Sequence, residues 1–374
     1  MADSANPITT KIPKPATAAT VARWVVEVRR RHGRGYLSQV ADMIRYNRGH
    51  QRINPIEYYL YHLYDRERHD AATRAQFIGH AGRRRIVRAL NDAKAAILAD
   101  DKLVTYGYLT GLGFPTPPLR ALYHPTRSHG ALRCLRDATQ AATYLRGEAT
   151  YPMFGKPLGR SNAVGVASLR GYRAGDDVLV LAGDRTIGVE TFVTTLDAFL
   201  PRGGYLFLEH LWPHAAMRDV CGERLCTVRV FALLGPQGPE ILGAVWKVVV
   251  GANMADNFVL KGNLLAAVDA ATGTVTRIVG GSGPDEREHE THPDTGARLV
   301  GFTLPLWDDL IALVKGAAGA FPRLPYQGWD IALTPSGPVI VELNSAGDLS
   351  LWQRPAGRGF MNERFRALLK GARP

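Results

Sequence analysis

The sequence predicts an α+β protein whose N-terminal part is helical. Between residues 20 and 95, apolar side chains recur at the 3.6-residue spacing of amphipathic helices. From residue 151 onward, short apolar runs typical of strands alternate with helical stretches, and strands dominate after residue 205. Because 374 residues exceed what one simple hydrophobic core holds, we expect two or three packed units.

The helical region is predicted to cover residues 20–100, after a flexible lead-in, residues 1–19, that is rich in Pro, Ala and Thr. One of its helices is expected to start at Asn54. Asn54 can cap the helix, the following proline suits the first turn, and Glu57 can bond back to the cap.

Strands, helices and turns are predicted in mixed order further along the chain. A segment over residues 101–204 is expected to hold a small subdomain, and residues 205–374 a larger one. We predict strands at residues 153–157, 178–181, 205–208, 227–234 and 241–250, helices at 193–200 and 306–318, and tight turns at 235–238 and 269–273.

Composition restricts the class of protein. With 46% hydrophobic and 21% charged residues, the chain has the composition of an ordinary folded protein. No run approaches the ~20 apolar residues of a membrane-spanning helix, and the first residues lack the apolar core of a secretory signal. Three cysteines are too few for a disulfide framework, so we expect a cytoplasmic protein.

Positive charge is concentrated in the first ninety residues. The chain has 46 Lys and Arg against 34 Asp and Glu, a net charge of +12, with arginine runs at residues 29–31 and 83–85. Such a field attracts anions, among them nucleotide phosphates and acidic substrates. We do not expect nucleic acid, because exposed stacking aromatics are not interleaved with the arginines. A solvated basic face without a dedicated partner is the plainer interpretation.

The strongest functional signal is a predicted β-hairpin over residues 328–344. Two apolar strands flank a Pro-Ser-Gly-Pro turn. Folding about that turn places Asp330 opposite Glu342, and the two-residue alternation of a strand brings Asn344 to the same face. Magnesium prefers such hard oxygen ligands and keeps its other positions for water and phosphates. We therefore expect a metal site at these three residues; the alternative is a polar outer face on an edge hairpin.

A phosphate-binding element is predicted upstream of the hairpin. Lys156 ends an apolar strand, and a loop of small residues over 157–166, which contains Ser161, follows it. Lysine supplies a positive point charge, and small residues let backbone N–H groups approach phosphate oxygens. Together with the hairpin this pattern favours a nucleotide-phosphate site, whereas alone it also fits a plain strand–helix turn.

Short motifs in order along the chain resemble the ATP-grasp superfamily, and in more detail the sugar-transfer-associated ATP-grasp proteins. The resemblance covers roughly residues 54–344 and ends with the hairpin. Its motifs include Glu57-Tyr58-Tyr59, Leu90-Asn91-Asp92, Asp101-Lys102-Leu103, Phe154-Gly155-Lys156-Pro157, Glu209-His210-Leu211, Thr227-Val228-Arg229-Val230 and Lys261-Gly262-Asn263.

The resemblance implies a nucleotide site between two subdomains. Two α+β subdomains would clamp ATP, with Mg²⁺ on its phosphates and the smaller subdomain acting as a mobile lid. Lys102 and Lys156 would be the nucleotide lysines. The segment Glu209, His210 and Leu211 would link the subdomains, and its backbone would read the adenine edge.

The resemblance also implies residues that act on the substrate. Arg229 would face the γ-phosphate or the activated carboxylate, and Lys261 would lie on a loop over the substrate together with Asp256 and Asn257. Some positions depart from the family pattern; Lys247, for example, stands where relatives often have arginine. No expected metal ligand or lysine is missing, so activity is expected and substrate recognition is expected to be specialised.

The expected activity is an ADP-forming, Mg-ATP-dependent ligase that activates a carboxylate as an acyl phosphate and couples it to an amine. Its partners would be small-molecule carboxylates and amines that carry anionic groups. Two other functions stay open from sequence: a small-molecule or sugar kinase on the same fold, and a nucleotide-binding accessory protein of polysaccharide or natural-product assembly. The oligomeric state is left open.

Overall fold

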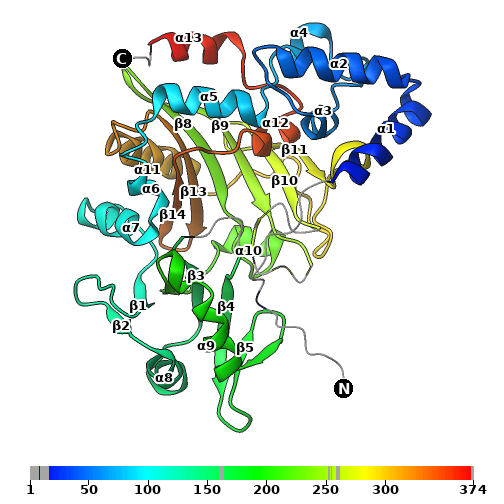
Figure 1. The fold of residues 1–374 in the computed structure, drawn as a ribbon. Helices are drawn as coiled ribbons and strands as arrows, with labels where there is room; N and C mark the ends of the chain where they lie inside the picture. Colours follow the sequence, from blue (N-terminus) through cyan, green and yellow to red (C-terminus); the bar gives the residue numbers. More distant parts are fainter. Residues whose placement is uncertain are drawn as a thin grey trace.

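Two seven-stranded β-sheets with helices around them form the chain (Figure 1). The computed structural model describes residues 8, 17–159, 164–251, 253, 255–257 and 262–371. Over these residues the predicted α+β class and the helical N-terminal region are confirmed. No helix among them combines the length and the apolar character needed to cross a bilayer.

In the described chain before the first strand, the regular elements are helices joined by turns and loops. They are α1 (Ala18–His32), α2 (Tyr36–Arg48), α3 (Pro55–Leu60), α4 (Ala71–Arg74), α5 (His80–Leu90), α6 (Ile97–Asp100) and α7 (Lys102–Gly111). Helix α3 starts as predicted: the Glu57 N–H donates to the Asn54 side chain, and the Asn54 N–H donates to the Glu57 carboxylate. This capping box satisfies N–H groups that a helix start leaves unpaired. Trp24, Tyr58 and Tyr59 belong to a hydrophobic core of this region.

The first sheet has the strand order β2-β1-β7-β3-β4-β5-β6. Its strands are β1 (Leu119–Tyr123), β2 (Arg133–Leu135), β3 (Met153–Pro157), β4 (Ala167–Arg173), β5 (Val178–Leu181), β6 (Thr186–Gly188) and β7 (Tyr205–Glu209). Helices α8 (Ala138–Thr143) and α9 (Val189–Asp197) contribute to the core on one face, together with the π-helical turn η1 (Tyr144–Glu148). Leu103 and Tyr106 of α7 pack with Leu122 and Leu206 in a separate cluster.

The second sheet has the order β12-β11-β10-β9-β8-β13-β14. Its strands are β8 (Val228–Gly235), β9 (Gly238–Val248), β10 (Leu264–Val268), β11 (Val275–Gly280), β12 (Arg287–His289), β13 (Tyr326–Thr334) and β14 (Gly337–Asn344). The accompanying helices are α10 (Ala215–Cys221), α11 (Trp307–Gly319), α12 (Ser350–Ala356) and α13 (Glu363–Gly371), with short 3-10 turns η2 (Leu200–Arg202) and η3 (Gly283–Asp285).

Most predicted strands and turns occur within a few residues of their expected positions. The turns at 235–238 and 269–273 connect β8 to β9 and β10 to β11. The helix expected at 193–200 instead begins at Val189, because Val189 and Phe192 already belong to its buried face. The strand expected at 205–208 is β7, and it pairs with β1 and β3 in the first sheet. The larger subdomain predicted for residues 205–374 thus begins with a strand that belongs to the first sheet.

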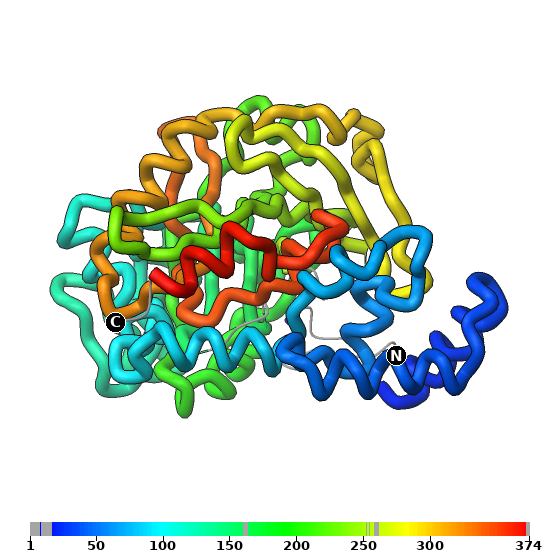
Figure 2. The backbone as a smooth tube through the Cα atoms, turned by 90° about the horizontal axis from the view of Figure 1, so that it is seen from above, coloured from blue at the N-terminus to red at the C-terminus, as the bar shows by residue number. Residues whose placement is uncertain are grey.

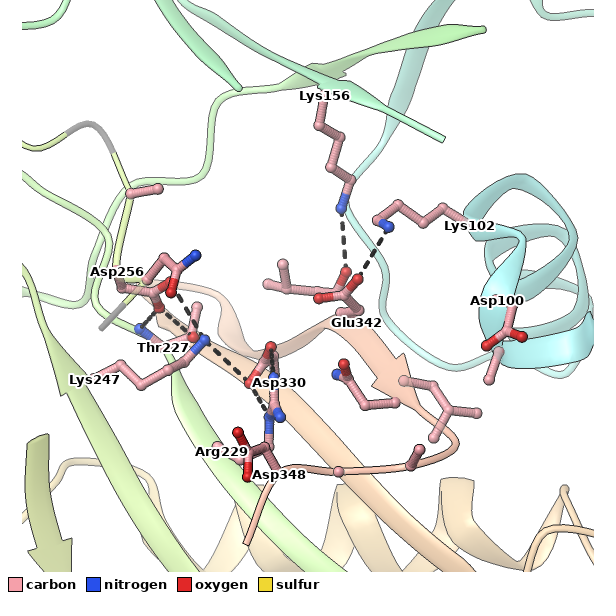
Figure 3. A pocket seen from close by; sticks show the side chains of 18 of the residues that line it. Asp100, Lys102, Lys156, Thr227, Arg229, Lys247, Asp256, Asp330, Glu342 and Asp348 are labelled. Atoms are coloured by element: carbon pink, nitrogen blue, oxygen red, sulfur yellow. Dashed lines mark hydrogen bonds and ion pairs between the residues drawn. The ribbon is translucent and has the colours of Figure 1, made fainter. Parts of the chain in front are cut away.

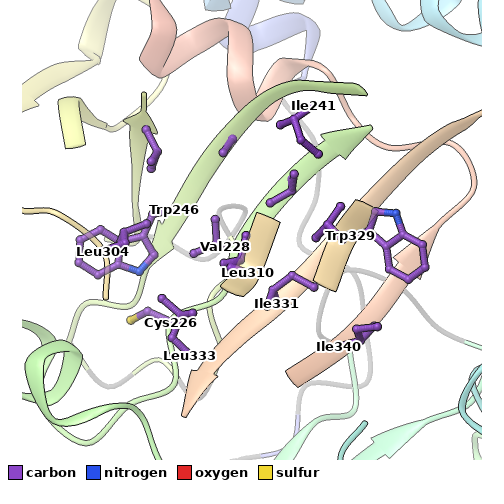
Figure 4. Close-up of a cluster of buried hydrophobic side chains, with 14 of the residues drawn as sticks. Cys226, Val228, Ile241, Trp246, Leu304, Leu310, Trp329, Ile331, Leu333 and Ile340 are labelled. Atoms are coloured by element: carbon purple, nitrogen blue, oxygen red, sulfur yellow. The ribbon is translucent and has the colours of Figure 1, made fainter. Parts of the chain in front are cut away.

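The two faces of the second sheet have different environments. Trp329, Ile331 and Leu333 of β13 pack with α11 in the largest core cluster (Figure 4). The opposite face packs against α5, α12 and α13. Figure 2 shows the N-terminal helices beside the C-terminal segment, where Gln353 of α12 donates to the backbone oxygen of Ile78 at 2.9 Å. Because side chains alternate along a strand, Asp330 lies on this second face rather than with Trp329 and Ile331.

The β13–β14 hairpin reaches its predicted register through a β-bulge. Its turn is two residues long, since Thr334 pairs with Gly337. An unbroken ladder from that turn would place Val341 opposite Asp330 and turn Glu342 to the other face. The register shifts by one residue between Ile331 and Asp330, so Val341 is the extra residue and Asp330 pairs with Glu342. The expected pairing is therefore confirmed, but it depends on the bulge as well as on the turn.

Candidate active site

A cavity of about 680 Å³ lies between the two sheets and is lined by both. Strand β3 of the first sheet contributes Lys156 and helix α7 contributes Lys102 (Figure 3). Strands of the second sheet contribute Arg229, Lys247, Asp330 and Glu342. The charged residues that line it are Arg83, Asp100, Lys102, Lys156, Arg229, Lys247, Asp256, Asp330, Glu342 and Asp348. Such a lining suits a ligand that carries several charges.

Asp330 forms the centre of a buried ionic network. Arg229, which is opposite Asp330 in the β8–β13 register, places Nε 2.5 Å from Oδ1 and Nη2 2.6 Å from Oδ2. Lys247 Nζ lies 3.2 Å from Asp330 Oδ1 and 3.3 Å from Asp256 Oδ1. Asp256 in turn accepts from the Thr227 N–H at 2.8 Å. The network therefore links three strands of the sheet to the segment around Asp256.

Charge attraction keeps the groups of this network ionised. Burial alone would raise the pKa of Asp330, but Arg229 and Lys247 outweigh it and lower that pKa to about 2. Burial would lower the pKa of Lys247, and attraction to Asp256 and Asp330 raises it instead. The network thus holds a carboxylate that stays negative and two cations that stay positive near neutral pH.

Glu342 and Asn344 extend the site along β14. Lys102, the first residue of α7, places Nζ 3.0 Å from Glu342 Oε1. Burial raises the pKa of Glu342, but attraction to Lys102 and Lys156 outweighs burial and lowers it. The Nδ2 atom of Asn344 is buried and has no hydrogen-bond partner among the described residues. Glu342 and Asn344 thus offer an ionised carboxylate and an amide beside Asp330.

Lys156 is hydrogen-bonded to the backbone of Val341, the extra residue of the β-bulge. Its Nζ lies 2.5 Å from the Tyr106 hydroxyl and 3.3 Å from the Val341 carbonyl oxygen. The same carbonyl accepts from the Tyr106 hydroxyl at 2.6 Å. Burial lowers the pKa of Lys156 to about 8, although Glu342 and Asp330 act in the opposite direction. The bulge residue thus orients Lys156 toward the cavity and also sets the register of Glu342.

The loop over residues 345–348 is fixed by the helical region and by the sheet. Asn91, just after α5, donates to the backbone oxygen of Ser345 at 2.6 Å and to that of Tyr326 at 2.7 Å. A Cβ at Gly347 would lie 3.4 Å from the Gly328 Cα and 3.3 Å from the Phe231 ring. Glycine at both 328 and 347 therefore lets this loop lie close against β13.

A second, smaller cavity of about 120 Å³ adjoins the first and shares Lys156 with it. Glu209, His210 and Leu211 line it after the end of β7. The Glu209 carboxylate forms an ion pair with Arg120. The two ring nitrogens of His210 are buried and lack a hydrogen-bond partner in the described part of the chain. Burial and the nearby Arg170 lower the pKa of His210 to about 4, so this ring is neutral at neutral pH.

The structure brings together most of the residues predicted from sequence. One cavity is lined by six of them, and the adjoining one by three more. Ser161 and Lys261 lie outside the described residues. The six that line the larger cavity are Lys102, Lys156, Arg229, Asp330, Glu342 and Asn344, and Glu209, His210 and Leu211 line the smaller one.

The cavity also contains charged residues that the sequence does not assign to the site. Lys247 belongs to the Asp330 network, and Arg83, Asp100 and Asp348 line the same cavity. Asp256, expected on the loop over the substrate, belongs to the same network. Lys247 could have been found as a lone charge within an apolar strand, a pattern that it shares with Arg229. Arg83 could not, because it stands in a run of three arginines.

The predicted ligand set fits magnesium by the chemistry of its donors. Two ionised carboxylates and one side-chain amide oxygen are hard ligands, and such sites leave coordination positions for phosphate and water. The Asp330 carboxylate already accepts from Arg229 at both oxygens and pairs with Lys247, and the Glu342 carboxylate pairs with Lys102. Because an ionised carboxylate has about four lone-pair sites, each still has at least one that could face a metal ion. Among the described residues, no cluster of three or more His, Cys, Asp or Glu side chains could hold a metal by itself. The amide oxygen of Asn344 would therefore complete the set of three ligands expected from the sequence.

Comparison with known proteins supports the resemblance found in the sequence. The family model of sugar-transfer associated ATP-grasp proteins matches residues 202–367, which contain β8 to β14. This match confirms the resemblance over that segment. Among curated protein sequences, none matches this chain significantly.

Solved structures give a weaker likeness. The D-alanine–D-alanine ligase from Coxiella burnetii is 11% identical, with a TM-score of 0.42, and 75% of this chain matches 59% of that one. The L-amino acid ligase from Bacillus licheniformis is 12% identical with a TM-score of 0.41, and 74% of this chain matches 49% of that one. The chain thus spans about half the length of these proteins. TM-scores below 0.5 support no conclusion about activity.

Proposed function

We propose, from its similarity to the sugar-transfer associated ATP-grasp proteins, that this chain is a Mg-ATP-dependent ligase that joins a carboxylate to an amine. The observation that carries the proposal is the convergence of Asp330, Glu342 and Asn344 in one cavity with cationic side chains from both sheets. A dedicated set of oxygen ligands beside lysines and arginine is what a metal–triphosphate complex requires.

The two cavities suggest how the nucleotide is divided between them. The larger one, with its lysines, would take the triphosphate. The smaller one would take the adenine, because its walls include the apolar side chains of Phe154, Leu208 and Val341. Lys156 lines both cavities and would contact the phosphates nearest the adenosine. The backbone at Leu211, just beyond the strand end, would be positioned to hydrogen-bond the base edge.

The residues of the larger cavity would act mainly by positioning and charge. Magnesium, held by Asp330, Glu342 and Asn344, would neutralise charge on the phosphates. Arg229 and Lys247 are locked in place by Asp330, so they would present fixed positive charge to the transferred phosphoryl group. Lys102 contacts Glu342 in this structure and would add a further cation at the phosphates.

The proposed reaction has two steps. A substrate carboxylate oxygen attacks the γ-phosphorus, the bond to the β–γ bridging oxygen breaks, and ADP leaves. The amine then attacks the carbonyl carbon of the acyl phosphate, inorganic phosphate leaves, and the amine loses a proton as the amide forms. The two sheets on either side of the cavity would keep water from the acyl phosphate.

Product analysis tests the ligase proposal. Purified protein would be incubated with ATP, magnesium and a panel of acids and amines, and ADP, AMP and phosphate would be followed. We expect ADP and free phosphate in equal amounts only when an acid and an amine are both present. ADP without released phosphate would mean transfer to an acceptor, and the kinase function would replace the ligase. AMP with pyrophosphate would contradict both.

We predict that ATP affinity falls as pH rises through about 8. Lys156 has its pKa lowered to about 8, so it is charged below that pH and loses its charge above it. Only the charged form attracts phosphate. Wild-type affinity, measured by calorimetry from pH 6.5 to 9.5, should therefore weaken across this range. Lys156→Met should weaken binding about 10- to 100-fold near pH 7, the effect expected for one charged hydrogen bond.

Two variants serve as controls for this experiment. Lys156→Arg should keep its charge throughout and remove the pH dependence. Lys315→Met changes an exposed lysine on α11 and should behave like the wild type. Wild-type affinity that stays constant over this pH range would contradict the assignment of Lys156 to the phosphates.

A further inference from the structure

Helix α5 of the N-terminal region places one buried arginine in the active-site cavity. Arg83 is only 8% exposed and lines the cavity, whereas its neighbours Arg84 and Arg85 are exposed. The preceding residue explains how the helix can approach so closely. A Cβ at Gly82 would lie 2.7 Å from the backbone oxygen of Gln51 and from the Ile78 side chain, so glycine is needed there.

Within the described ranges, the hydrogen-bond partners of the Arg83 guanidinium are neutral groups. Its Nη1 donates to the Gly347 carbonyl oxygen at 3.2 Å, and its Nη2 lies 2.7 Å from His80 Nδ1. Its Nε is buried without a hydrogen-bond partner in the described part of the chain. Burial and Arg83 itself lower the pKa of His80, so His80 accepts as a neutral ring.

The nearest acidic residues form no direct ion pair with Arg83 in the described part of the chain, although attraction to Arg83 opposes the rise that burial causes in the pKa of Glu57. Within the described residues, no carboxylate lies within 4.0 Å of its guanidinium, since no ion pair includes Arg83. Both oxygens of Glu57 accept backbone N–H groups, from Asn54 and from His80. Asp348 accepts from the Ser350 N–H at the start of α12. A guanidinium stays charged at any relevant pH, and a buried charge without a counter-charge is costly.

Arg83 adjoins the part of the cavity that contains Arg229. The Gly347 carbonyl that Arg83 binds belongs to the loop that lies against Gly328. A Cβ at Gly328 would lie 3.2 Å from the Gly347 Cα and 3.5 Å from the Arg229 Cδ. Arg229 is already paired with Asp330. Of the two arginines, Arg83 is therefore the one that forms no ion pair with another described residue.

We propose that Arg83 binds a second acidic group of the substrate, so that the acid activated by this enzyme carries two anionic groups rather than one. The first acidic group is the carboxylate that would be phosphorylated, and its place near Arg229 and Asp330 rests on the proposed function. The second group would be a carboxylate or a phosphate, since both accept the paired N–H donors of a guanidinium. The helical N-terminal region, outside the segment matched by the family model, would thereby select the substrate.

The test compares a diacid with a monoacid of similar length. Binding of glutarate and of butyrate to the full chain would be measured by calorimetry, with and without Mg-AMPPNP. We expect the wild type to prefer glutarate by about tenfold or more, and Arg83→Gln to lose this preference. Arg84→Gln, an exposed arginine on the same helix, should keep it. Binding of inorganic phosphate would be measured in the same way. If Arg83→Gln weakens the binding of phosphate but not that of glutarate, the second acidic group of the substrate is a phosphate.

Several outcomes would overturn the proposal. One is a wild type that binds neither glutarate nor phosphate in preference to butyrate. Another is Arg83→Gln that keeps the wild-type preference. If Arg83→Gln does not fold, Arg83→Lys would be measured instead. Lysine keeps the positive charge but lacks the paired N–H donors of the guanidinium, so the preference for glutarate over butyrate should drop at least about threefold. Arg83 acting only as a clamp on Gly347 would change thermal stability and leave the preference unchanged.

The measurement separates this proposal from the proposed function. AMPPNP binding is scored independently, and its absence would contradict the nucleotide site. The preference for glutarate over butyrate, measured without nucleotide, would still test Arg83, because the contacts that position its guanidinium come from the protein and not from ATP.

Discussion

Replacing Glu342 by glutamine is expected to lower ATP-dependent product formation by about 10²- to 10³-fold, the effect of removing one fixed electrostatic contributor to a transition state. The variant keeps the size of the side chain but loses the negative charge that pairs with Lys102 and that would bind the magnesium ion. Product formation at saturating ATP and magnesium would be compared with the wild type. Circular dichroism and thermal unfolding would check that the fold is intact.

The control for this prediction is Glu240→Gln. Glu240 lies on β9 of the same sheet, and its side chain is 38% exposed in an ion pair with Arg364. It should retain wild-type activity. A Glu342→Gln enzyme as active as Glu240→Gln would show that Glu342 is not a metal ligand.

Replacing Arg229 by methionine is expected to lower the free energy of unfolding by up to about 3–5 kcal/mol, because the buried Asp330 carboxylate loses the larger part of its counter-charge and two hydrogen bonds. Arg229 and Asp330 are 8% and 5% exposed, and Lys247 alone would remain beside the carboxylate. Denaturant unfolding near neutral pH would measure the loss. The double variant Arg229→Met, Asp330→Leu should recover much of the stability but remain inactive.

The pH dependence of this effect has a defined sign. The pKa of Asp330 is lowered from its ordinary value of 3.8 to about 2 in the folded protein. Its stabilising contribution is therefore present above about pH 4 and is lost as pH falls toward 2. The difference between wild type and Arg229→Met should shrink over that range.

The exposed pair of Arg298 and Glu290 provides the matched control. Its side chains are 68% and 71% exposed. Arg298→Met should change stability by less than about 1 kcal/mol, as expected for a surface ion pair. Equal losses of unfolding free energy in Arg229→Met and Arg298→Met would contradict the conclusion that the buried pair of Arg229 and Asp330 stabilises the fold more than a surface ion pair does.

The sequence is sufficient to predict the hairpin and the pairing of Asp330 with Glu342 because these residues are close together in the chain. Asp330, Glu342 and Asn344 are separated by one turn, so strand alternation and the turn position nearly determine their faces. The bulge at Val341 was not predictable from that pattern. It reflects the tertiary contacts of the Val341 carbonyl with Tyr106 and Lys156.

The remaining site residues depend on contacts that sequence alone does not indicate. Lys247 approaches Asp330 only because β9 and β13 are both neighbours of β8 in the sheet. Arg83 and Arg84 are adjacent and chemically identical, yet one faces the cavity and the other faces solvent. Helical spacing indicates which residues share a face of α5, but not what that face contacts. Burial of Arg83 follows from the docking of the helical region on the second sheet.

A crystal structure of the protein with magnesium and AMPPNP would show directly whether the β13–β14 hairpin binds the metal of a metal–nucleotide complex. We expect a metal ion bound by the side-chain oxygens of Asp330, Glu342 and Asn344, with the triphosphate next to Lys102 and Lys156 and the adenine beside Leu211. Nucleotide bound elsewhere on the molecule, or a triphosphate whose metal contacts none of the three hairpin residues, would contradict this expectation.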